Sequence, residues 1–144
     1  SLQGIPAMAL SQYYGPANVN ADDPFEASRV HGVAVLRKLL EAGMQDDQPY
    51  QLFYNINFPP VPAADVKGAR VVRQGIRQGT KFGVEPHLSP SGRRFLWIRG
   101  GDQRAPVAEG TDAAANLDGY ISVTPMRADL TDYACLDKLS GKLE

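Results

Sequence analysis

The sequence predicts an α/β core that carries a β-rich extension. Three observations lead to this fold class: an apolar strand is followed by one long amphipathic helix, further strands then come in series with no helix between them, and a short helix comes last. With 144 residues, 43% of them hydrophobic and 22% charged, the chain has the size and composition of a folded globular protein.

The first two elements are a buried strand and an amphipathic helix. Residues 4–12 form an uncharged apolar run of the kind found in buried, parallel strands. The helix is predicted over residues 24–42, because apolar side chains recur there every three or four positions. Asp23 is the expected N-cap and Pro24 suits the first helical position. Gly43 is the expected left-handed stop.

Strands in series make up the middle of the chain. Residues 51–59 alternate between apolar and polar side chains, with Leu52, Tyr54, Ile56 and Phe58 on one side. Residues 66–76 form a further strand candidate with a basic face. The segments 82–87 and 94–98 flank the turn sequence LSPSGR and predict a hairpin.

The C-terminal part is predicted to hold one strand and one helix. Residues 120–124 form the strand, which Pro125 should close because proline lacks a backbone N–H. A helix is expected from Thr131 to about residue 139, with Thr131 as its cap and a hydrophobic contact between Leu130 and Cys135 at its start.

The charges are unevenly distributed along the chain. Residues 66–104 hold nine Lys or Arg and two acidic residues, a net charge of +7, although the net charge of the whole chain is −1. Such a segment is typical of a surface for nucleic acid or phosphate. The excess of basic residues is also explained by a solvated hairpin face, or by two patches that meet across an oligomer. We favour these simpler interpretations.

The aromatic residues of the hairpin suggest a contact surface. Phe95 and Trp97 lie two positions apart and therefore on one face of a strand, which suits a protein contact and also a platform for stacked bases. We select four residues as candidates for a subunit interface: Phe82, Val84, Phe95 and Trp97.

The residues by themselves assign no catalytic group and no metal ligand. His31 and His87 are the only histidines, and neither has a neighbour at ligand spacing. The acidic pairs at 22–23 and 46–47 could serve a cation or acid–base chemistry, but a helix start and a loop explain them as well. Phosphate-binding glycine loops and nucleophile elbows are missing from the sequence.

The cysteine count, the hydropathy and the start of the chain bear on the cellular setting. The single cysteine, Cys135, cannot form an internal disulfide, which fits a reducing cytoplasm. No apolar run approaches the roughly 20 residues that span a bilayer, so we expect no membrane partner. The chain starts without methionine or a signal peptide and enters its apolar pattern at once, so we expect it to be part of a longer protein.

Four stretches together resemble the C-terminal portion of the SurE (survival protein E) family of metal-dependent nucleotidases. They are LQGIPAMALS (2–11), LFYNINFPPVPAADVKGARVVRQG (52–75), SPSGRRFLWIRGG (89–101) and EGTDAAANLDGYISVTPMRADLT (109–131). The last is the most specific, because Gly-Thr-Asp, Gly-Tyr and Ser-Val-Thr-Pro follow one another in a fixed order.

The resemblance implies a division of the chain into three parts. Residues 1–65 would be the C-terminal part of a three-layer α/β/α core, and residues 66–108 a β-rich extension with an exposed hairpin. Residues 109–144 would form a hinge, a strand and a C-terminal helical arm that packs on a partner subunit. Gly110, Thr111 and Asp112 are then expected to act as a hinge and as a cap of the Ala-rich turn that follows, rather than as a catalytic loop.

The resemblance also implies a function for the parent protein. It would hydrolyse nucleoside monophosphates with a divalent metal ion, Mg or Mn, in the cytoplasm and as a homodimer or homotetramer. The family's Asn-Asp-Asp-Gly strand and its serine and asparagine loops do not occur here, so the metal ligands are expected upstream of Ser1 and this chain alone should be inactive. The alternative is a non-enzymatic module whose basic hairpin binds nucleic acid or a protein.

Overall fold

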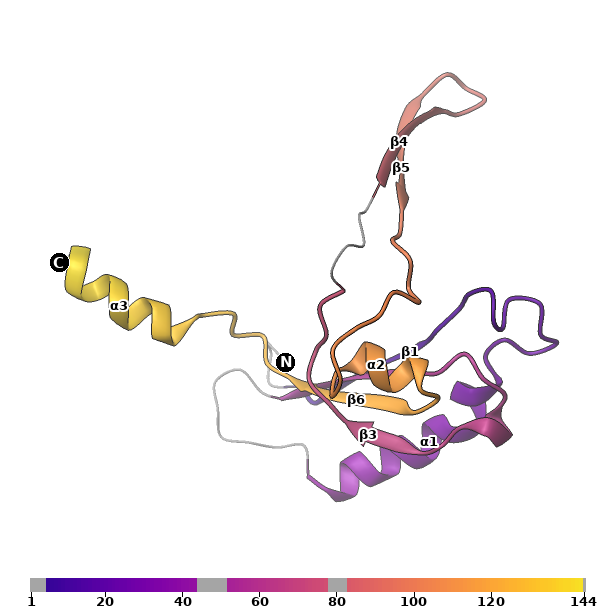
Figure 1. The fold of residues 1–144 in the computed structure, drawn as a ribbon, viewed down its shortest axis with the longest axis horizontal. Coiled ribbons are helices and arrows are strands. Elements are labelled where there is room, and N and C mark those ends of the chain that lie inside the picture. The colour runs from indigo at the N-terminus through magenta and orange to yellow at the C-terminus, as the bar shows by residue number, and fades with distance from the viewer. Residues whose placement is uncertain (1–4, 44–51, 78–82, 144) are drawn as a thin grey trace.

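The computed structural model of the chain describes residues 5–43, 52–77 and 83–143. Their main feature is a four-stranded sheet in the order β1-β2-β6-β3, from which a two-stranded hairpin, β4-β5, projects (Figure 1). The strands are β1 (Ala7–Gln12), β2 (Phe53–Phe58), β3 (Ala69–Val71), β4 (Gly83–Leu88), β5 (Arg94–Arg99) and β6 (Ile121–Met126). The helices are α1 (Glu26–Glu41), the 3-10 helix η1 (Ala63–Asp65), α2 (Asp112–Leu117) and α3 (Tyr133–Leu143).

One face of the sheet forms the hydrophobic core. The predicted alternation of β2 is confirmed, because Ile56 and Phe58 point to the same side and each is 0% exposed. Helix α1 covers this face, and Gly32 brings its backbone close to the side chains of Leu10 and Phe58. The core cluster consists of Ala27, Val35, Ile56, Phe58, Ile121 and Val123. The parallel pairing of β1 with β2 places α1 as the crossover between them.

The opposite face of the sheet is polar. Asn57 of β2 pairs with Ser122 of β6, and Asn55 pairs with Thr124, so these four side chains share the face that α2 covers. The Nδ2 atom of Asn116 in α2 donates a hydrogen bond of 2.8 Å to the Asn57 carbonyl. The hydroxyls of Ser122 and Thr124 are buried, and the described residues offer them no hydrogen-bond partner. The sheet thus separates an apolar layer from a polar one.

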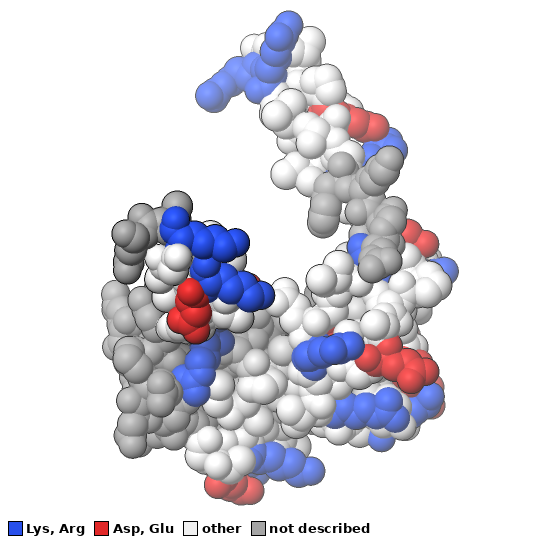
Figure 2. Space-filling model, turned by 60° about the vertical axis from the view of Figure 1, so that its left-hand side comes forward, with Lys and Arg blue, Asp and Glu red and all other residues white. Residues whose placement is uncertain are grey.

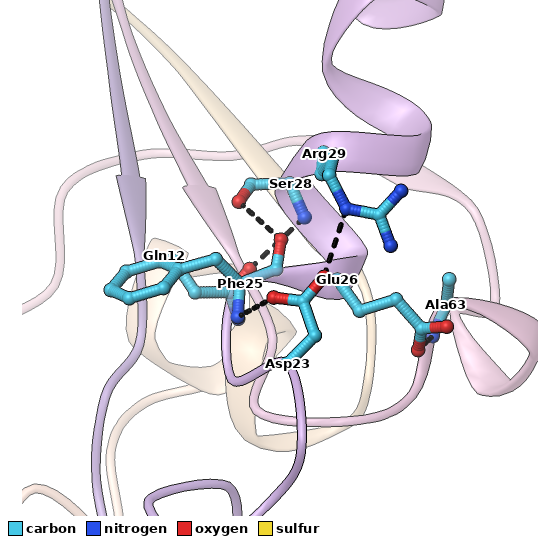
Figure 3. Close-up of polar contacts among 7 residues, drawn as sticks. All are labelled: Gln12, Asp23, Phe25, Glu26, Ser28, Arg29 and Ala63. Carbon is cyan, nitrogen blue, oxygen red and sulfur yellow. Dashed lines mark hydrogen bonds and ion pairs between the residues drawn. The ribbon is translucent and has the colours of Figure 1, made fainter.

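The start of α1 differs from the prediction. The helix begins at Glu26 rather than at residue 24, and Asp23 is not its N-cap. Instead, one oxygen of Asp23 accepts the Phe25 N–H at 3.0 Å, and the other pairs with the Arg29 guanidinium at 2.8 Å (Figure 3). The hydrogen bond from Arg29, and then that from Phe25, lowers the pKa of the Asp23 carboxyl below its ordinary value of 3.8. The predicted stop is confirmed, with Gly43 at a φ of 85°.

Strands β3 and β6 also depart from their predicted lengths. Strand β3 covers only three residues of the predicted segment 66–76. Strand β6 does not end at Pro125, which pairs with Tyr54 inside the ladder, and it continues to Met126. Strand β3 ends opposite Val123, so the edge of β6 beyond that point is unpaired on one side and tolerates a residue without an N–H.

The last helix begins later than predicted and without the expected hydrophobic contact. Helix α3 starts at Tyr133, and the carboxylate of Asp132, not the Thr131 hydroxyl, accepts the Cys135 N–H at 3.0 Å. Leu130 is 93% exposed and Cys135 is also exposed, so they do not bury one another. Figure 1 shows α3 well separated from the sheet. The described helices are all too short or too polar to cross a bilayer.

Replacing Phe58 tests whether β2 anchors the core. Phe58→Ala should lower the free energy of unfolding by roughly 3–5 kcal/mol, because a fully buried ring is lost and a cavity remains. Phe58→Leu keeps most of the volume and should cost about 1 kcal/mol. Urea titration followed by circular dichroism measures both. Equal, small losses would show that the ring does not anchor the core.

Candidate functional site

A cavity of about 420 Å³ opens at the carboxyl ends of the parallel strands β1 and β2. Ligands of open α/β sheets bind outside the carboxyl ends of the strands, and small-molecule sites typically have volumes of roughly 300–1,000 Å³. Four segments line the cavity: Ser11, Gln12, Tyr13 and Tyr14 at the end of β1, Asn55 and Asn57 of β2, Gly75, Arg77 and Gln103 of the extension, and Asp112, Ala113 and Asn116 of α2.

The polar face of the sheet forms part of this cavity. Asn55 and Asn57 belong to the cavity lining, and the two lining residues that carry a formal charge are Arg77 and Asp112. Arg77 is directed to the opposite limb of the extension, where it donates to the Gln103 carbonyl. Uncharged amides both donate and accept hydrogen bonds. The cavity is therefore suited to a polar ligand part that carries little charge.

Gln12 connects three elements at the edge of the cavity. Its Nε2 atom donates to the Pro59 carbonyl at 2.7 Å. Its Oε1 atom accepts the Ser28 N–H at 3.1 Å, and Figure 3 shows this second bond. The first bond reaches the end of β2 and the second reaches the first turn of α1. Both ends of the amide are occupied, so Gln12 positions the chain around the cavity and has little capacity left for a ligand.

The three residues expected to act as hinge and cap lie beside the cavity. Gly110 has a φ of 72°, a conformation that favours glycine. Thr111 is the N-cap of α2, and its hydroxyl accepts the Ala114 N–H at 3.4 Å. One carboxylate oxygen of Asp112 accepts the Gly75 N–H at 2.8 Å.

Backbone contacts join the same segment to the extension. The Arg73 N–H donates to the Gly110 carbonyl at 3.3 Å, and the Asp112 N–H donates to the Arg73 carbonyl at 2.9 Å. These bonds fasten the extension to the start of α2. Strand β6 lies between these hydrogen-bonded residues and the C-terminal arm. That residues 110–112 act as a hinge for the arm stays a prediction.

The four interface candidates do not share one face of the hairpin. Phe82 lies outside the described residues. Phe95 pairs with His87 and Trp97 pairs with Glu85, whereas Val84 pairs with Ile98 and lies on the opposite face. The sequence alone could not reveal this, because the face on which Val84 lies depends on the register between the two strands.

The two hairpin faces differ in chemistry. On the face that carries Phe95 and Trp97, the His87 ring stacks on Phe95 with centroids 5.6 Å apart, and Glu85 pairs with Arg99 at 3.1 Å. The side chains of this face are therefore engaged in contacts within the hairpin. The second face consists of six exposed residues: the apolar Val84, Pro86, Leu88, Leu96 and Ile98, and Arg94, which pairs with Leu88 at the turn end of the hairpin. We call this second surface the apolar hairpin face.

The described residues do not provide a metal site. No three side chains of His, Cys, Asp or Glu come together in the ranges 5–43, 52–77 and 83–143. His31 faces the core side, where its Nε2 atom lies 2.8 Å from the Ala63 carbonyl. Asp23 is occupied at the start of α1, and residues 46–47 lie outside the described part. A divalent metal does not fit the side chains that this part of the chain presents.

Sequence reasoning missed most of the cavity. It selected Asp112 from the lining but not Gln12, Tyr14, Asn55 or Asn57. A usable signal was present, because these residues lie on, or directly after, two strands of which the first has the apolar composition of a parallel strand. Polar residues at the carboxyl ends of such strands are candidates for a ligand site.

The described residues form an α/β fold with a cavity at the carboxyl ends of two parallel strands. The chain belongs to the SurE family, since the family model described as "Survival protein SurE" matches residues 1–81. The 5'-nucleotidase SurE of Ruegeria pomeroyi is 62% identical over 143 residues, covering 99% of this chain and 55% of the relative. That of Cereibacter sphaeroides (strain ATCC 17025) is 63% identical over 141 residues, covering 98% and 54%.

A solved structure supports the same assignment. The crystal structure of SurE from Aquifex aeolicus superimposes with a TM-score of 0.68 and 33% identity, covering 96% of this chain and 52% of that one. The resemblance found in the sequence and the SurE-like α/β fold class are thereby confirmed. The chain spans about half the length of the curated relatives that it matches.

Gly75 provides a test of the contact between the extension and α2. A Cβ atom at this position would lie 2.9 Å from the Thr111 Cβ and 3.0 Å from the Asp112 carboxylate oxygen. Gly75→Ala should therefore lower the free energy of unfolding by about 1–3 kcal/mol. The control is Gly100→Ala, where no atom lies within 4 Å, and this change should be neutral or slightly stabilising. Equal melting temperatures for the two variants would contradict the close contact.

Proposed function

We propose that this chain is part of a divalent-metal-dependent 5'-nucleotidase, which hydrolyses nucleoside monophosphates to nucleosides and inorganic phosphate. The observation that carries the proposal is 62% identity, over 99% of the chain, to a protein named 5'-nucleotidase SurE. The position of the cavity is consistent with it, because the carboxyl ends of β1 and β2 are where an α/β sheet binds its ligand.

In this proposal the two halves of the enzyme have different tasks. Water supplies the oxygen that attacks phosphorus, the bond to the 5'-oxygen breaks, and that oxygen leaves with a proton as the nucleoside hydroxyl. A divalent ion, Mg²⁺ or Mn²⁺, would supply charge stabilisation at the phosphate and would be held by residues outside this chain. The present residues bind and orient the nucleoside part, for which the uncharged amides of Asn55 and Asn57 are suitable.

We also propose a homodimer or homotetramer, assembled in part through the apolar hairpin face. Leu88, Leu96 and Ile98 are each 67–68% exposed, which is unusual for three neighbouring large apolar residues. Burial against a second copy would remove this area from water. A cytoplasmic location belongs to the same proposal, and it is supported by a lone, exposed cysteine.

A nucleic-acid function has less support. On the surface drawn in Figure 2, basic residues lie in separate groups with acidic residues among them, rather than in one continuous patch. Several of them already have partners: the Arg70 guanidinium lies 3.5 Å from the centre of the Tyr120 ring, and Arg99 pairs with Glu85. A backbone-binding surface would need these charges to be available for phosphates.

The activity is tested with a full-length chain that contains residues 1–144. This protein should release phosphate from a nucleoside monophosphate when Mg²⁺ or Mn²⁺ is present, and EDTA should abolish the activity until metal is restored. Residues 1–144 alone should release none, because the metal ligands are proposed to lie elsewhere. Metal-dependent hydrolysis by residues 1–144 would contradict that division, and an inactive full-length protein would contradict the function.

The two hairpin faces can be compared by mutation. The double variant Leu96→Ser/Ile98→Ser should weaken association by at least ~2 kcal/mol, about 30-fold in dissociation constant, because it removes apolar area from the centre of the proposed contact. Phe95→Ser/Trp97→Ser is the matched variant on the other face and should have a smaller effect. Sedimentation equilibrium over a concentration series measures both. A larger effect of the aromatic pair would place the contact on the opposite face.

A further inference from the structure

An exposed aromatic pair lies at the edge of the cavity. Tyr14 belongs to the cavity lining, is 56% exposed, and stacks on Phe25 with ring centroids 6.0 Å apart and an angle of 7° between the planes. A second hollow of about 400 Å³ adjoins it, and Tyr14 and Gln103 line both hollows. A large flat side chain is therefore accessible at the place where the end of β1 faces the extension.

The backbone on both sides of Tyr14 is fixed by a buried amide. Asn18 is 7% exposed. Its Nδ2 atom donates to the Tyr13 carbonyl at 2.7 Å and to the Pro24 carbonyl at 3.0 Å, and its Oδ1 atom accepts the Gly15 N–H at 3.0 Å. One side chain thus holds the residue before Tyr14, the residue after it and the residue before Phe25.

Phe25 is held from its other side as well. Its N–H donates to the Asp23 carboxylate, which in turn pairs with Arg29, and Figure 3 shows these groups together at the start of α1. The Phe25 carbonyl accepts the Ser28 hydroxyl at 2.9 Å. Phe25 covers part of Tyr14 and fixes the plane of its ring. Because the backbone on both sides of Tyr14 is fixed, and its ring stacks on Phe25 and is still more than half exposed, the ring is preorganised for a contact.

The surroundings indicate which ligand would use this ring. A planar group gains by stacking on an aromatic side chain, and such stacking tolerates all bases because each has a π-face. The amides of Asn55 and Asn57, which line the same cavity, can donate to and accept from the edge of a base. A nucleobase is a planar group that also forms uncharged hydrogen bonds, so it would use both the ring and the amides. A protein partner could contact the ring without using the amides.

We propose that Tyr14 is the platform on which the nucleobase of the substrate stacks, and that Phe25 is its positioning residue. The inference rests on the proposed nucleotidase function and adds to it. In the same enzyme, Tyr14 would distinguish nucleoside monophosphates from phosphate esters that lack a base.

The test compares substrates with and without a base, in the full-length protein that contains this chain. In Tyr14→Leu, the KM for AMP should rise by about 5- to 100-fold with kcat little changed, because base stacking contributes to binding and not to the reaction at phosphorus. The kcat/KM for ribose 5-phosphate, which has no planar group to stack, should stay unchanged. Tyr14→Phe keeps the ring and should remain near the unsubstituted protein, and Phe25→Leu should give a smaller rise in KM.

A binding measurement separates this inference from the proposed function. Adenosine has no phosphate, so its calorimetric Kd reports binding of the nucleoside part alone, and Tyr14→Leu should weaken that binding by a similar factor. An inactive protein that still binds adenosine through Tyr14 would reject the nucleotidase and retain the base site. The proposal is overturned if Tyr14→Leu affects both phosphate esters equally, if it leaves AMP and adenosine unaffected, or if it changes only the oligomeric state.

Discussion

The alternation of side chains along β2 is the constraint on which the remaining structure depends. Ile56 and Phe58 are completely buried on one face, and Asn55 and Asn57 face the cavity on the other. Since β2 pairs with both β1 and β6, its register sets the faces of its neighbours too. A shift by one residue would bring the amides into the core and the apolar side chains into the cavity. The same strand therefore specifies the core and the ligand-facing surface.

Hydrogen bonds from side-chain amides and carboxylates to the backbone hold the loops around the cavity. Gln12 connects β1 with the end of β2 and with α1, Asn18 fixes the loop that carries Tyr14, and Asp112 holds the Gly75 N–H. The partners of Gln12 and Asp112 lie up to 47 residues away in sequence. Buried polar groups need such partners, because an unpaired one costs about 1–3 kcal/mol. Loops are thus kept in place without regular secondary structure.

The extension contributes to two surfaces at once. Its limbs bring Gly75, Arg77 and Gln103 to the cavity, and its tip presents the apolar hairpin face. If a second copy covers that face, assembly would also steady the limbs that line the cavity, since both belong to one continuous segment.

The sequence by itself determined several of the regular elements and the family. Alternation and helical periodicity are local, so α1, β2 and the hairpin were predictable, and four stretches, of which 109–131 was the most specific, together identified the SurE resemblance. Only the tertiary structure decided the rest. Asp23 bonds to Phe25 instead of capping α1, Pro125 lies within β6, and Val84 lies opposite Phe95. The cavity joins Asn57, Gly75 and Asp112, because pairing between distant segments, and not local pattern, sets which polar side chains meet.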